Sequence, residues 1–312
     1  MSRIVTITFN PVIDKSTTVD SLVPEKKLRC SLPKFEPGGG GLNVSRAIKK
    51  LGGHSLAIFP AGGHSGKFLE KLVAAEGVDF KTVEIKNHTR ENMIVLDASN
   101  NQQYRFGMPG PELDDEEWKA CLKKIEAEDD VSYIVASGSL ATGVPTNIIA
   151  QIAAIANQKG AKLIVDTSGE ALQHAVQQGV FMIKPNLHEL SSLVGKEEVV
   201  ANEVDDVARE IINKGQCELI IVSLGPTGAM AVTRDDLFQM TPPVVKKKST
   251  VGAGDSMVAG IVLSLSRGKT IKEALRYGIA CGTAATMNEG TELCRLEDVE
   301  RLYPLVKTTA IL

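Results

Sequence analysis

From residue 131 onward, apolar strand-like segments alternate with helix-like segments, and this alternation constrains the fold more than any other feature. The strand-like segments are 131–138, 161–169, 181–186 and 217–225, and the helix-like ones are 145–159, a run ending at 194, 253–267 and 271–287. Strands that are apolar throughout are typical of a parallel sheet covered by helices on both faces. Ligands of such sheets bind beyond the carboxyl ends of the strands.

Two intervals, 12–36 and 86–108, do not follow this pattern. They contain the strand-like pieces 15–23, 27–35, 92–98 and 102–108 with no helix between them. We expect them to form one small sheet, which cannot bury both of its faces alone and therefore acts as a lid, a dimer face or both. The main domain then comprises 1–11, which contains a first strand at 3–9, together with 37–85 and 109–312.

Composition excludes several classes of protein. The chain has 312 residues, 43% hydrophobic and 23% charged, with a net charge of −3. No overall positive field attracts nucleic acid or an anionic membrane, so cations for an anionic substrate must be local. No signal-peptide layout or apolar run of about 18 residues is present. Five scattered cysteines suggest buried free thiols in a reducing cytoplasm.

Two glycine-rich stretches imitate nucleotide-binding motifs and fail on inspection. In "AGGHSGKF" (61–68), Ala61 replaces the first glycine of a P-loop and Phe68 replaces its Ser/Thr, so we expect a turn into a helix. In "GGGGLN" (38–43), Asn43 stands at the third glycine of the dinucleotide fingerprint, and a proline interrupts the preceding "KFEP". A nicotinamide-dependent enzyme is therefore disfavoured.

The stretch "STVGAGDSMVAG" (249–260) carries the first candidate for chemistry. Gly252, Ala253 and Gly254 permit a tight turn, and the helix that follows directs free N–H groups and its positive dipole end to the same point. These groups form an anion hole suited to a phosphoryl group. Asp255 is then either a general base or an acid that stabilises the first helical turn, and the residues alone leave both open.

Four other features also allow a structural and a functional interpretation. Asp14 is a turn residue after a strand or an acceptor for hydroxyl groups. Arg90 and Arg105 are solvated or hold a phosphate. Asn186 and Glu189 form a capping box or organise a metal. "SLGPTG" (223–228) is a plain hairpin turn or admits phosphates.

The pattern of motifs resembles the ribokinase-like PfkB family of carbohydrate kinases over essentially the whole chain. "PGGGGLNVSRAIKKLGG" (37–53) and "STVGAGDSMVAG" resemble the two signatures of the family. "QQYRFGMPG", "VDTSGEAL", "IKPNLHEL", "VSLGPTGA" and "NEGTELC" fit between and after them. The resemblance implies a three-layer α/β/α fold with a mostly parallel central sheet and a small β-sheet lid. It also favours Asp255 as the catalytic base, with the Gly252–Gly254 backbone as the anion hole.

For the sugar, the resemblance implies binding by the glycine run and the lid. The implied residues are Asp14, Lys27, Gly39, Gly40, Asn43, Arg90, Arg105 and Ser139. Relatives that act on tagatose 6-phosphate or fructose 1-phosphate usually carry a lysine where this chain has Gly40. That difference favours fructose 6-phosphate.

For the nucleotide and ions, the resemblance implies a second set of residues. ATP is expected at Lys184, Asn186, Ser223, Gly225, Gly228 and Gly254, with Glu189 holding Mg²⁺ through water. A monovalent cation, K⁺, is expected at Ser249, Val251, Ala285, Asn288 and Gly290. The run Lys246–Lys248 has no role beyond a basic edge near the nucleotide.

The expected activity is ATP-dependent phosphorylation of fructose 6-phosphate at its 1-hydroxyl, giving fructose 1,6-bisphosphate, by a cytoplasmic homodimer that joins through the lid. Tagatose-6-phosphate kinase and 1-phosphofructokinase are the enzymatic alternatives. A sugar-phosphate-binding regulator without activity is the alternative from another class. The intact Asp255 and Glu189 argue against such a regulator.

Overall fold

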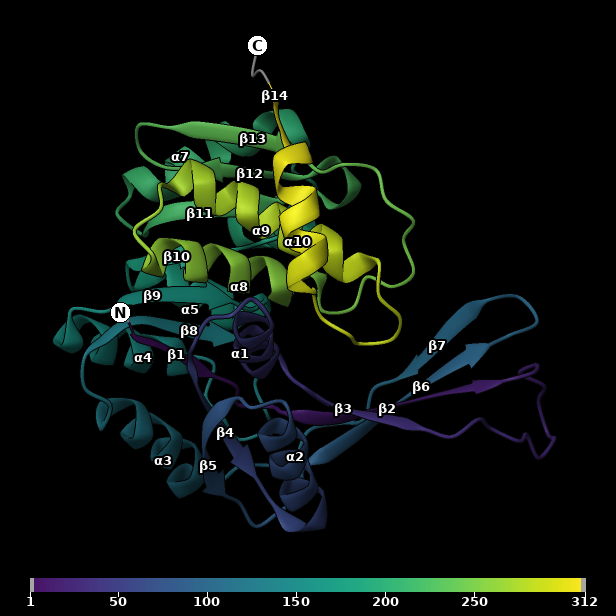
Figure 1. The fold of residues 1–312 in the computed structure, drawn as a ribbon. Helices are drawn as coiled ribbons and strands as arrows, with labels where there is room; N and C mark the ends of the chain where they lie inside the picture. The colour runs from purple at the N-terminus through teal and green to yellow at the C-terminus, as the bar shows by residue number, and fades with distance from the viewer. Residues whose placement is uncertain (1–2, 310–312) are drawn as a thin grey trace.

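Ten strands of the computed structural model, which describes residues 3–309, form one central sheet (Figure 1). The order across the sheet is β14-β13-β12-β11-β10-β9-β8-β1-β4-β5. The strands are β1 (Arg3–Ile7), β4 (Leu56–Ala61), β5 (Asp79–Glu84), β8 (Val131–Ser137), β9 (Lys162–Asp166), β10 (Val180–Ile183), β11 (Cys217–Ser223), β12 (Ala229–Val232), β13 (Leu237–Thr241) and β14 (Lys307–Thr309).

The central sheet is parallel from β5 through β11 and antiparallel from β11 through β14. The predicted alternation of strands and helices is therefore confirmed as far as β11. Only 224–228 separates β11 from β12, and so short a connection permits an antiparallel neighbour but no helical crossover. The antiparallel strands at this end of the sheet were not predicted.

Helices cover both faces of the central sheet and give the three expected layers (Figure 1). One face packs against α1 (Gly40–Lys50), α8 (Ala253–Ser266), α9 (Ile271–Thr286) and α10 (Leu296–Leu302), with α2 (Gly63–Ala75) over β4 and β5. The other packs against α3 (Asp115–Glu126), α4 (Ile148–Lys159), α5 (Gly169–Gln177), α6 (Leu187–Val194) and α7 (Val204–Asn213). No helix within 3–309 is both long and apolar enough to cross a bilayer.

A separate four-stranded sheet projects from the main body, as Figure 1 shows at its right. Its order is β3-β2-β6-β7, from β2 (Val12–Val19), β3 (Lys34–Gly38), β6 (Arg90–Asp97) and β7 (Gln102–Phe106). The prediction that two insertions form one small sheet is confirmed. The strand predicted at 27–35 is largely wrong, because β3 begins only at Lys34 and 20–33 lies outside any strand of this sheet.

The 20–33 segment also corrects the prediction that all the cysteines are buried. Cys30 lies in this segment and is exposed, whereas the other four are buried free thiols. The nearby Leu32 is 95% exposed. Few parts of the chain contact this segment, apart from hydrogen bonds such as that from the Ser31 N–H to the Thr18 carbonyl, 2.9 Å.

The register of the small sheet places several polar side chains on one face. Asp14 on β2 lies opposite Asn92 on β6 and Glu36 on β3. Residues directly opposite each other, or two apart on a strand, share a face. Arg90 and Arg105 also lie on this face, because Arg90 is two residues from Asn92 and Arg105 pairs with Ile94. The sheet thus gathers acidic, amide and guanidinium groups on one side.

The two glycine-rich stretches that imitate nucleotide-binding motifs, 61–68 and 38–43, have the structures that their sequences allow. Residues 61–68 lead from β4 into α2, which begins at Gly63, as predicted. A strand does run into 38–43 despite Pro37, contrary to our expectation. Since β3 is an edge strand, the missing N–H of Pro37 costs no ladder hydrogen bond.

Candidate active site

The carboxyl edge of the parallel strands brings most of the predicted residues together. Ser139 follows β8, Asp166 ends β9, Lys184 follows β10, and Ser223 ends β11. The amino-terminal end of α8 meets the same edge, because a methyl group at Gly254 would lie 3.7 Å from the Lys184 Nζ. This is the position at which parallel α/β sheets bind their ligands.

The start of α8 leaves several N–H groups free. Gly252 caps the helix in the left-handed region with φ 72°, where a side chain would also lie 2.6 Å from Leu293 Cδ2. The Ala253 N–H reaches the Thr250 carbonyl only at 3.4 Å. Among the backbone hydrogen bonds of 3–309, the N–H groups of Gly254 and Asp255 have no acceptor. The local structure therefore supplies donors and a positive dipole end for an anion.

Asp255, in the first turn of α8, has a raised pKa. Burial and the neighbouring Asp166 carboxylate raise the pKa of Asp255 to about 6, against the hydrogen bond from Asn43 and the charges of Lys184 and Arg46. A carboxylate with such a pKa is ionised at neutral pH and is a stronger base than an ordinary aspartate.

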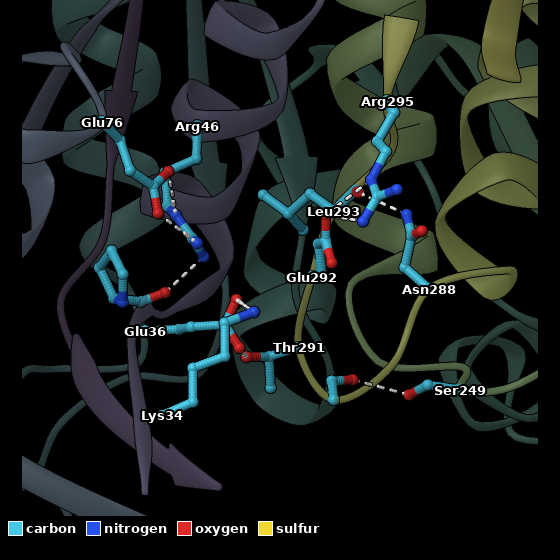
Figure 2. A network of polar contacts seen from close by, with 12 residues as sticks. Lys34, Glu36, Arg46, Glu76, Ser249, Asn288, Thr291, Glu292, Leu293 and Arg295 are labelled. Atoms are coloured by element: carbon cyan, nitrogen blue, oxygen red, sulfur yellow. Dashed lines mark hydrogen bonds and ion pairs between the residues drawn. The ribbon is translucent and has the colours of Figure 1, made fainter. Parts of the chain in front are cut away.

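Asn43, from the other signature, contacts Asp255 directly. Its Nδ2 donates to Asp255 Oδ2 at 3.0 Å, and its Oδ1 accepts from Arg46 Nη1 at 2.9 Å. Arg46 in turn donates to both carboxylate oxygens of Glu76, at 2.9 and 2.6 Å, and to the Pro37 carbonyl (Figure 2). The two glycine-rich signatures thus meet through one amide.

The glycine run at 38–41 leaves no room for side chains. A methyl group at Gly38 would lie 2.6 Å from Asp14 Oδ2, and one at Gly40 would lie 2.4 Å from Ser137 Oγ and 2.5 Å from the Gly138 nitrogen. Gly39 has φ +111°, a conformation that favours glycine. The run therefore packs α1 directly against the ends of β1 and β8 and leaves Gly39 and Gly40 partly exposed.

Asp14, Arg90 and Arg105 lie near one another, as the sequence predicts. Burial raises the pKa of Asp14, while the hydrogen bond from Asn92 Nδ2, 3.1 Å, and the charges of Arg105 and Arg90 lower it. Arg90 donates to the backbone carbonyls of Asn10 and Met108 at 3.0 and 3.2 Å. Arg90 Nε and Asn10 Oδ1 are the buried side-chain atoms of residues 3–309 that have no hydrogen-bond partner. They mark a polar spot that suits a polar ligand.

Ser139 joins this group, but Lys27 does not. Asn10 Nδ2 donates to Ser139 Oγ at 3.1 Å. Lys27 is exposed on the 20–33 segment, which links β2 to β3 at the outer end of the small sheet (Figure 1). A single chain does not bring Lys27 to Asp14 or Asp255, and its role stays a prediction.

Lys184 stands between the carboxylates of the site. Its Nζ lies 3.1 Å from Asp166 Oδ1, and both side chains are largely buried. Burial alone lowers the pKa of Lys184, but Asp166, Glu189 and Asp255 raise it above the usual range, so the ammonium stays charged. Its charge is therefore fixed beside the free N–H groups of α8.

Asn186 and Glu189 form the capping box of α6. Asn186 Oδ1 accepts from the Glu189 N–H at 2.8 Å, and Glu189 Oε2 accepts from the Asn186 N–H at 2.9 Å. The capping box is thus present, but it does not exclude a metal role for Glu189. Its other carboxylate oxygen, Oε1, makes no hydrogen bond or ion pair within 3–309. That oxygen can reach a hydrated cation.

A cavity of about 520 Å³ lies beside the start of α8. Its lining includes Asn186, Ser223, Gly225, Gly228 and Gly254 from the predicted nucleotide set, and apolar or small residues such as Pro242, Val245, Met257, Ile279 and Gly282. Lys247 also lines it, whereas Lys248 pairs with Glu289 at 3.1 Å. The cavity combines a polar end at α8 with apolar walls suited to a planar base.

The residues predicted for a monovalent cation lie in two segments that hydrogen bonds join. Ser249 Oγ donates to the Gly290 carbonyl at 2.8 Å and accepts from the Val251 N–H at 3.2 Å. The Asn288 N–H donates to the Ala285 carbonyl at 3.1 Å. Thr291 Oγ1 donates to Glu36 Oε2 at 2.9 Å, which ties this loop to β3 of the small sheet (Figure 2).

Sequence reasoning missed Asp166, Arg46, Asn92 and Asn10. Asp166 carries a readable signal, because it is a carboxylate at the end of an apolar strand in a predicted parallel sheet. Asn10 likewise follows the first strand. Arg46 and Asn92 give no such signal, since their contacts depend on how α1 and the small sheet pack.

The fold and the site together define a phosphoryl-transfer enzyme of the α/β class. Residues 7–298 match the pfkB family carbohydrate kinase model. The chain is 44% identical to the ATP-dependent 6-phosphofructokinase isozyme 2 of Escherichia coli over 304 residues, 97% of this chain and 98% of the relative. It is 31% identical to the 1-phosphofructokinase of Bacillus subtilis over 99% of this chain and 100% of the relative.

Solved structures of related kinases have the same fold as this chain. The Escherichia coli phosphofructokinase-2 in complex with potassium has a TM-score of 0.93 and 45% identity over 98% of this chain and 99% of that one. A tetrameric inhibited form of phosphofructokinase-2 from Escherichia coli has a TM-score of 0.92 at 43% identity, with coverage of 98% and 99%. The chain belongs to the pfkB family of carbohydrate kinases.

Replacing the Asp255 carboxylate with an amide should stabilise the protein at neutral pH. The Asp255 pKa rises on folding from an ordinary 3.8 to about 6. The folded state therefore holds the proton more tightly, and the protein loses stability as pH rises through this window. The loss is complete above it, up to about 3 kcal/mol. We expect Asp255→Asn to melt at a higher temperature than the unsubstituted protein at pH 8, and the difference to shrink below pH 5. Equal melting temperatures at both pH values would contradict the raised pKa.

Proposed function

We propose that this chain transfers the γ-phosphoryl group of ATP to the 1-hydroxyl of fructose 6-phosphate, giving fructose 1,6-bisphosphate and ADP. The observation that carries the proposal is the position of Asp255. It lies between Asn43, which follows the glycine run, and the cavity that Gly254 lines, beside the free N–H groups that begin α8. A hydroxyl held there faces both a base and an anion hole.

The transfer then needs little rearrangement of the protein. Asp255 takes the proton from the 1-hydroxyl as its oxygen attacks the γ-phosphorus and the bond to the β–γ bridging oxygen breaks. The backbone of Gly252, Ala253 and Gly254 and the Lys184 ammonium stabilise the charge on the transferring group. Because these donors are already oriented, their contribution costs no reorganisation at the moment of reaction.

The sugar phosphate is proposed to bind between the glycine run and the polar face of the small sheet. Asp14 and Asn43 accept from or donate to its hydroxyls, near the exposed backbone of Gly39 and Gly40. Arg90 and Arg105 hold its phosphate, with Ser139 close by. The unpaired Arg90 Nε and Asn10 Oδ1 support this placement, because a ligand would satisfy them. The small sheet would then act as a lid that keeps water from the phosphoryl group.

For ATP, we propose the cavity lined by Asn186, Ser223, Gly225 and Gly228. The free Glu189 Oε1 suits Mg²⁺, which proteins usually bind through one or two carboxylates, with water and substrate phosphates completing its shell. Bound Mg²⁺ would neutralise phosphate charge. Residues 3–309 contain no cluster of three or more His, Cys, Asp or Glu for a fully protein-bound ion, which agrees with a cation held partly by phosphates.

A monovalent cation is proposed at Ser249, Val251, Ala285, Asn288 and Gly290. Hydrogen bonds hold the two segments that carry these residues together. The potassium complex of the Escherichia coli relative supports K⁺ as the ion. Since 249–251 leads into α8, a cation there would stabilise the turn that forms the anion hole.

Fructose 6-phosphate is preferred to the alternatives for two reasons. The identity to the Escherichia coli 6-phosphofructokinase is 44%, against 31% to the Bacillus subtilis 1-phosphofructokinase. The site also has no room at Gly40 for the lysine that relatives of the other two kinds usually carry there, because even a methyl group would contact Ser137 and Gly138. A regulator without activity would have no need of a carboxylate with a raised pKa beside free N–H groups.

Turnover on three sugar phosphates tests the substrate. With MgATP, we expect kcat/KM on fructose 6-phosphate to exceed that on tagatose 6-phosphate and on fructose 1-phosphate.

Potassium should increase turnover relative to a buffer whose only monovalent cation is tetramethylammonium, because that ion is too large for a carbonyl-lined site. Preference for fructose 1-phosphate would overturn the substrate assignment, and equal rates in the two buffers would overturn the cation.

We further propose a cytoplasmic homodimer joined through the small sheet. Leu32, Phe106 and Met108, which belong to this sheet or its connections, are 95%, 46% and 47% exposed. Large apolar side chains left exposed on one projecting sheet and its connections support an interface there. The Escherichia coli relative also occurs as a tetramer, described as an inhibited form.

Sedimentation velocity tests this assembly. We expect a dimer at micromolar concentration and a monomer for Phe106→Asp, because a charge on the apolar surface of the interface is costly to bury. Val244→Asp, a substitution at another exposed apolar residue outside the small sheet, should leave the dimer intact. A monomeric unsubstituted protein, or a dimer that survives Phe106→Asp, would contradict the proposal.

A further inference from the structure

We infer that Arg46, held by Glu76, is a positioning residue that orients the Asn43 amide toward Asp255 and thereby sets the catalytic carboxylate. The inference rests on the proposed role of Asp255 as the base. Neither Arg46 nor Glu76 belongs to the glycine run or lines the proposed nucleotide cavity.

The geometry shows one guanidinium that fixes two elements of the site. Arg46 is 1% exposed and is among the largest fully buried side chains. Its Nε and Nη2 donate to Glu76, and its Nη1 donates to Asn43 Oδ1 and to the Pro37 carbonyl. Figure 2 shows the Arg46 and Glu76 side chains facing each other, joined by two hydrogen bonds.

These contacts decide which way the Asn43 amide points. An arginine is only a donor, so it must meet the amide oxygen and leave the amide nitrogen on the opposite side. That nitrogen faces Asp255 Oδ2 at 3.0 Å. If the amide were reversed, its oxygen would face the Asp255 carboxylate, and two acceptors would oppose each other. Arg46 therefore excludes the unproductive orientation.

The Arg46 charge acts in the same direction as the amide. Asp255 faces Asn43 and Arg46 from α1, Lys184 from the segment after β10, and Asp166 from β9. Burial and Asp166 raise its pKa, while Asn43, Lys184 and Arg46 lower it. A lysine in place of Arg46 keeps the charge but loses the fork that holds the Asn43 amide, so the hydrogen bond from Asn43 weakens and the Asp255 pKa should rise.

Glu76 explains how the site tolerates this buried cation. An unpaired buried arginine would be costly, and a carboxylate that accepts two of its hydrogen bonds offsets much of that cost. Glu76 is the C-cap of α2. A chain of hydrogen bonds through Glu76, Arg46 and Asn43 therefore connects the end of α2 to Asp255. The same arginine binds the Pro37 carbonyl on β3 and lowers the pKa of Asp14, which joins the small sheet to this network.

The test compares Arg46→Lys and Glu76→Gln with a control at a second buried ion pair. Lysine keeps the charge but lacks the planar fork that reaches three acceptors. We expect kcat of Arg46→Lys to fall about 10- to 100-fold, the scale of one lost hydrogen bond to a charged group. The acid limb of the pH–kcat profile should move to higher pH, with a smaller change in KM for MgATP. Glu76→Gln, which leaves the Arg46 fork without its charged partner, should also lower kcat, to a lesser degree.

Glu128→Gln is the matched control. Glu128 is 3% exposed and pairs with Arg3 at 2.6 Å and with Lys81, before β8 and away from Asp255. This variant should lose stability, measured by thermal melting, yet keep the pH profile. An unchanged profile for Arg46→Lys, or an equal shift for Glu128→Gln, would overturn the inference.

A substrate-free titration separates this inference from the proposed reaction. The carboxyl carbon of Asp255 can be followed by NMR in protein with ¹³C-labelled aspartate, and assigned by its loss in Asp255→Asn. We expect its pKa to be higher in Arg46→Lys than in the unsubstituted protein. If that shift occurs but no sugar phosphate is phosphorylated, the proposed function fails and the positioning role stands. If activity is present but the Asp255 pKa does not move, the positioning role fails.

Discussion

The hydrogen bond between Asn43 and Asp255 is the contact on which the rest of the site depends. It spans 212 residues of sequence and joins the start of α1 to the start of α8 at the carboxyl edge of one parallel sheet. Glycines stand at the start of both helices, Gly38–Gly41 at α1 and Gly252 and Gly254 at α8, and glycines let the backbone approach a ligand closely. The glycine run before α1 faces the polar side of the small sheet, and the start of α8 lines the cavity of about 520 Å³. One carboxylate thus lies where an acceptor hydroxyl and a phosphoryl donor can meet.

At the carboxyl edge of the central sheet, opposing influences on the pKa of Asp255 partly offset one another. Asp166 and burial raise the pKa of Asp255, whereas Lys184, Arg46 and Asn43 lower it. The net result is a base that is ionised at neutral pH and still has appreciable affinity for a proton. The folded protein loses stability by keeping this carboxylate buried, as is common where a site is arranged for chemistry. The chain as a whole is slightly acidic, so the positive charge near the site comes from a few residues such as Lys184, Arg90 and Arg105.

Much of this arrangement could be predicted from the sequence, and the exceptions have physical reasons. The apolar strands of the parallel sheet, the small sheet from two insertions and the long helices α8 and α9 are local patterns, and the structure confirms them. The strand expected at 27–35 did not form, because strand-like composition without a partner strand is not enough. Asp166 could have been found as the carboxylate that ends an apolar strand. Arg46 and Glu76 could not, since an arginine and a glutamate 30 residues apart resemble any solvated pair until the fold brings α1 and the residue after α2 together.

The central claim is that Asp255 removes the proton from the sugar hydroxyl. Rapid-quench measurement of a single turnover on fructose 6-phosphate, with the Asp255→Asn variant saturated in MgATP, tests it most directly. Loss of a general base predicts a rate of phosphoryl transfer about 100- to 10,000-fold lower. Binding of both substrates, measured separately by calorimetry, should be retained. An Asp255→Asn variant that binds both substrates and transfers the phosphoryl group at the unsubstituted rate would contradict the account.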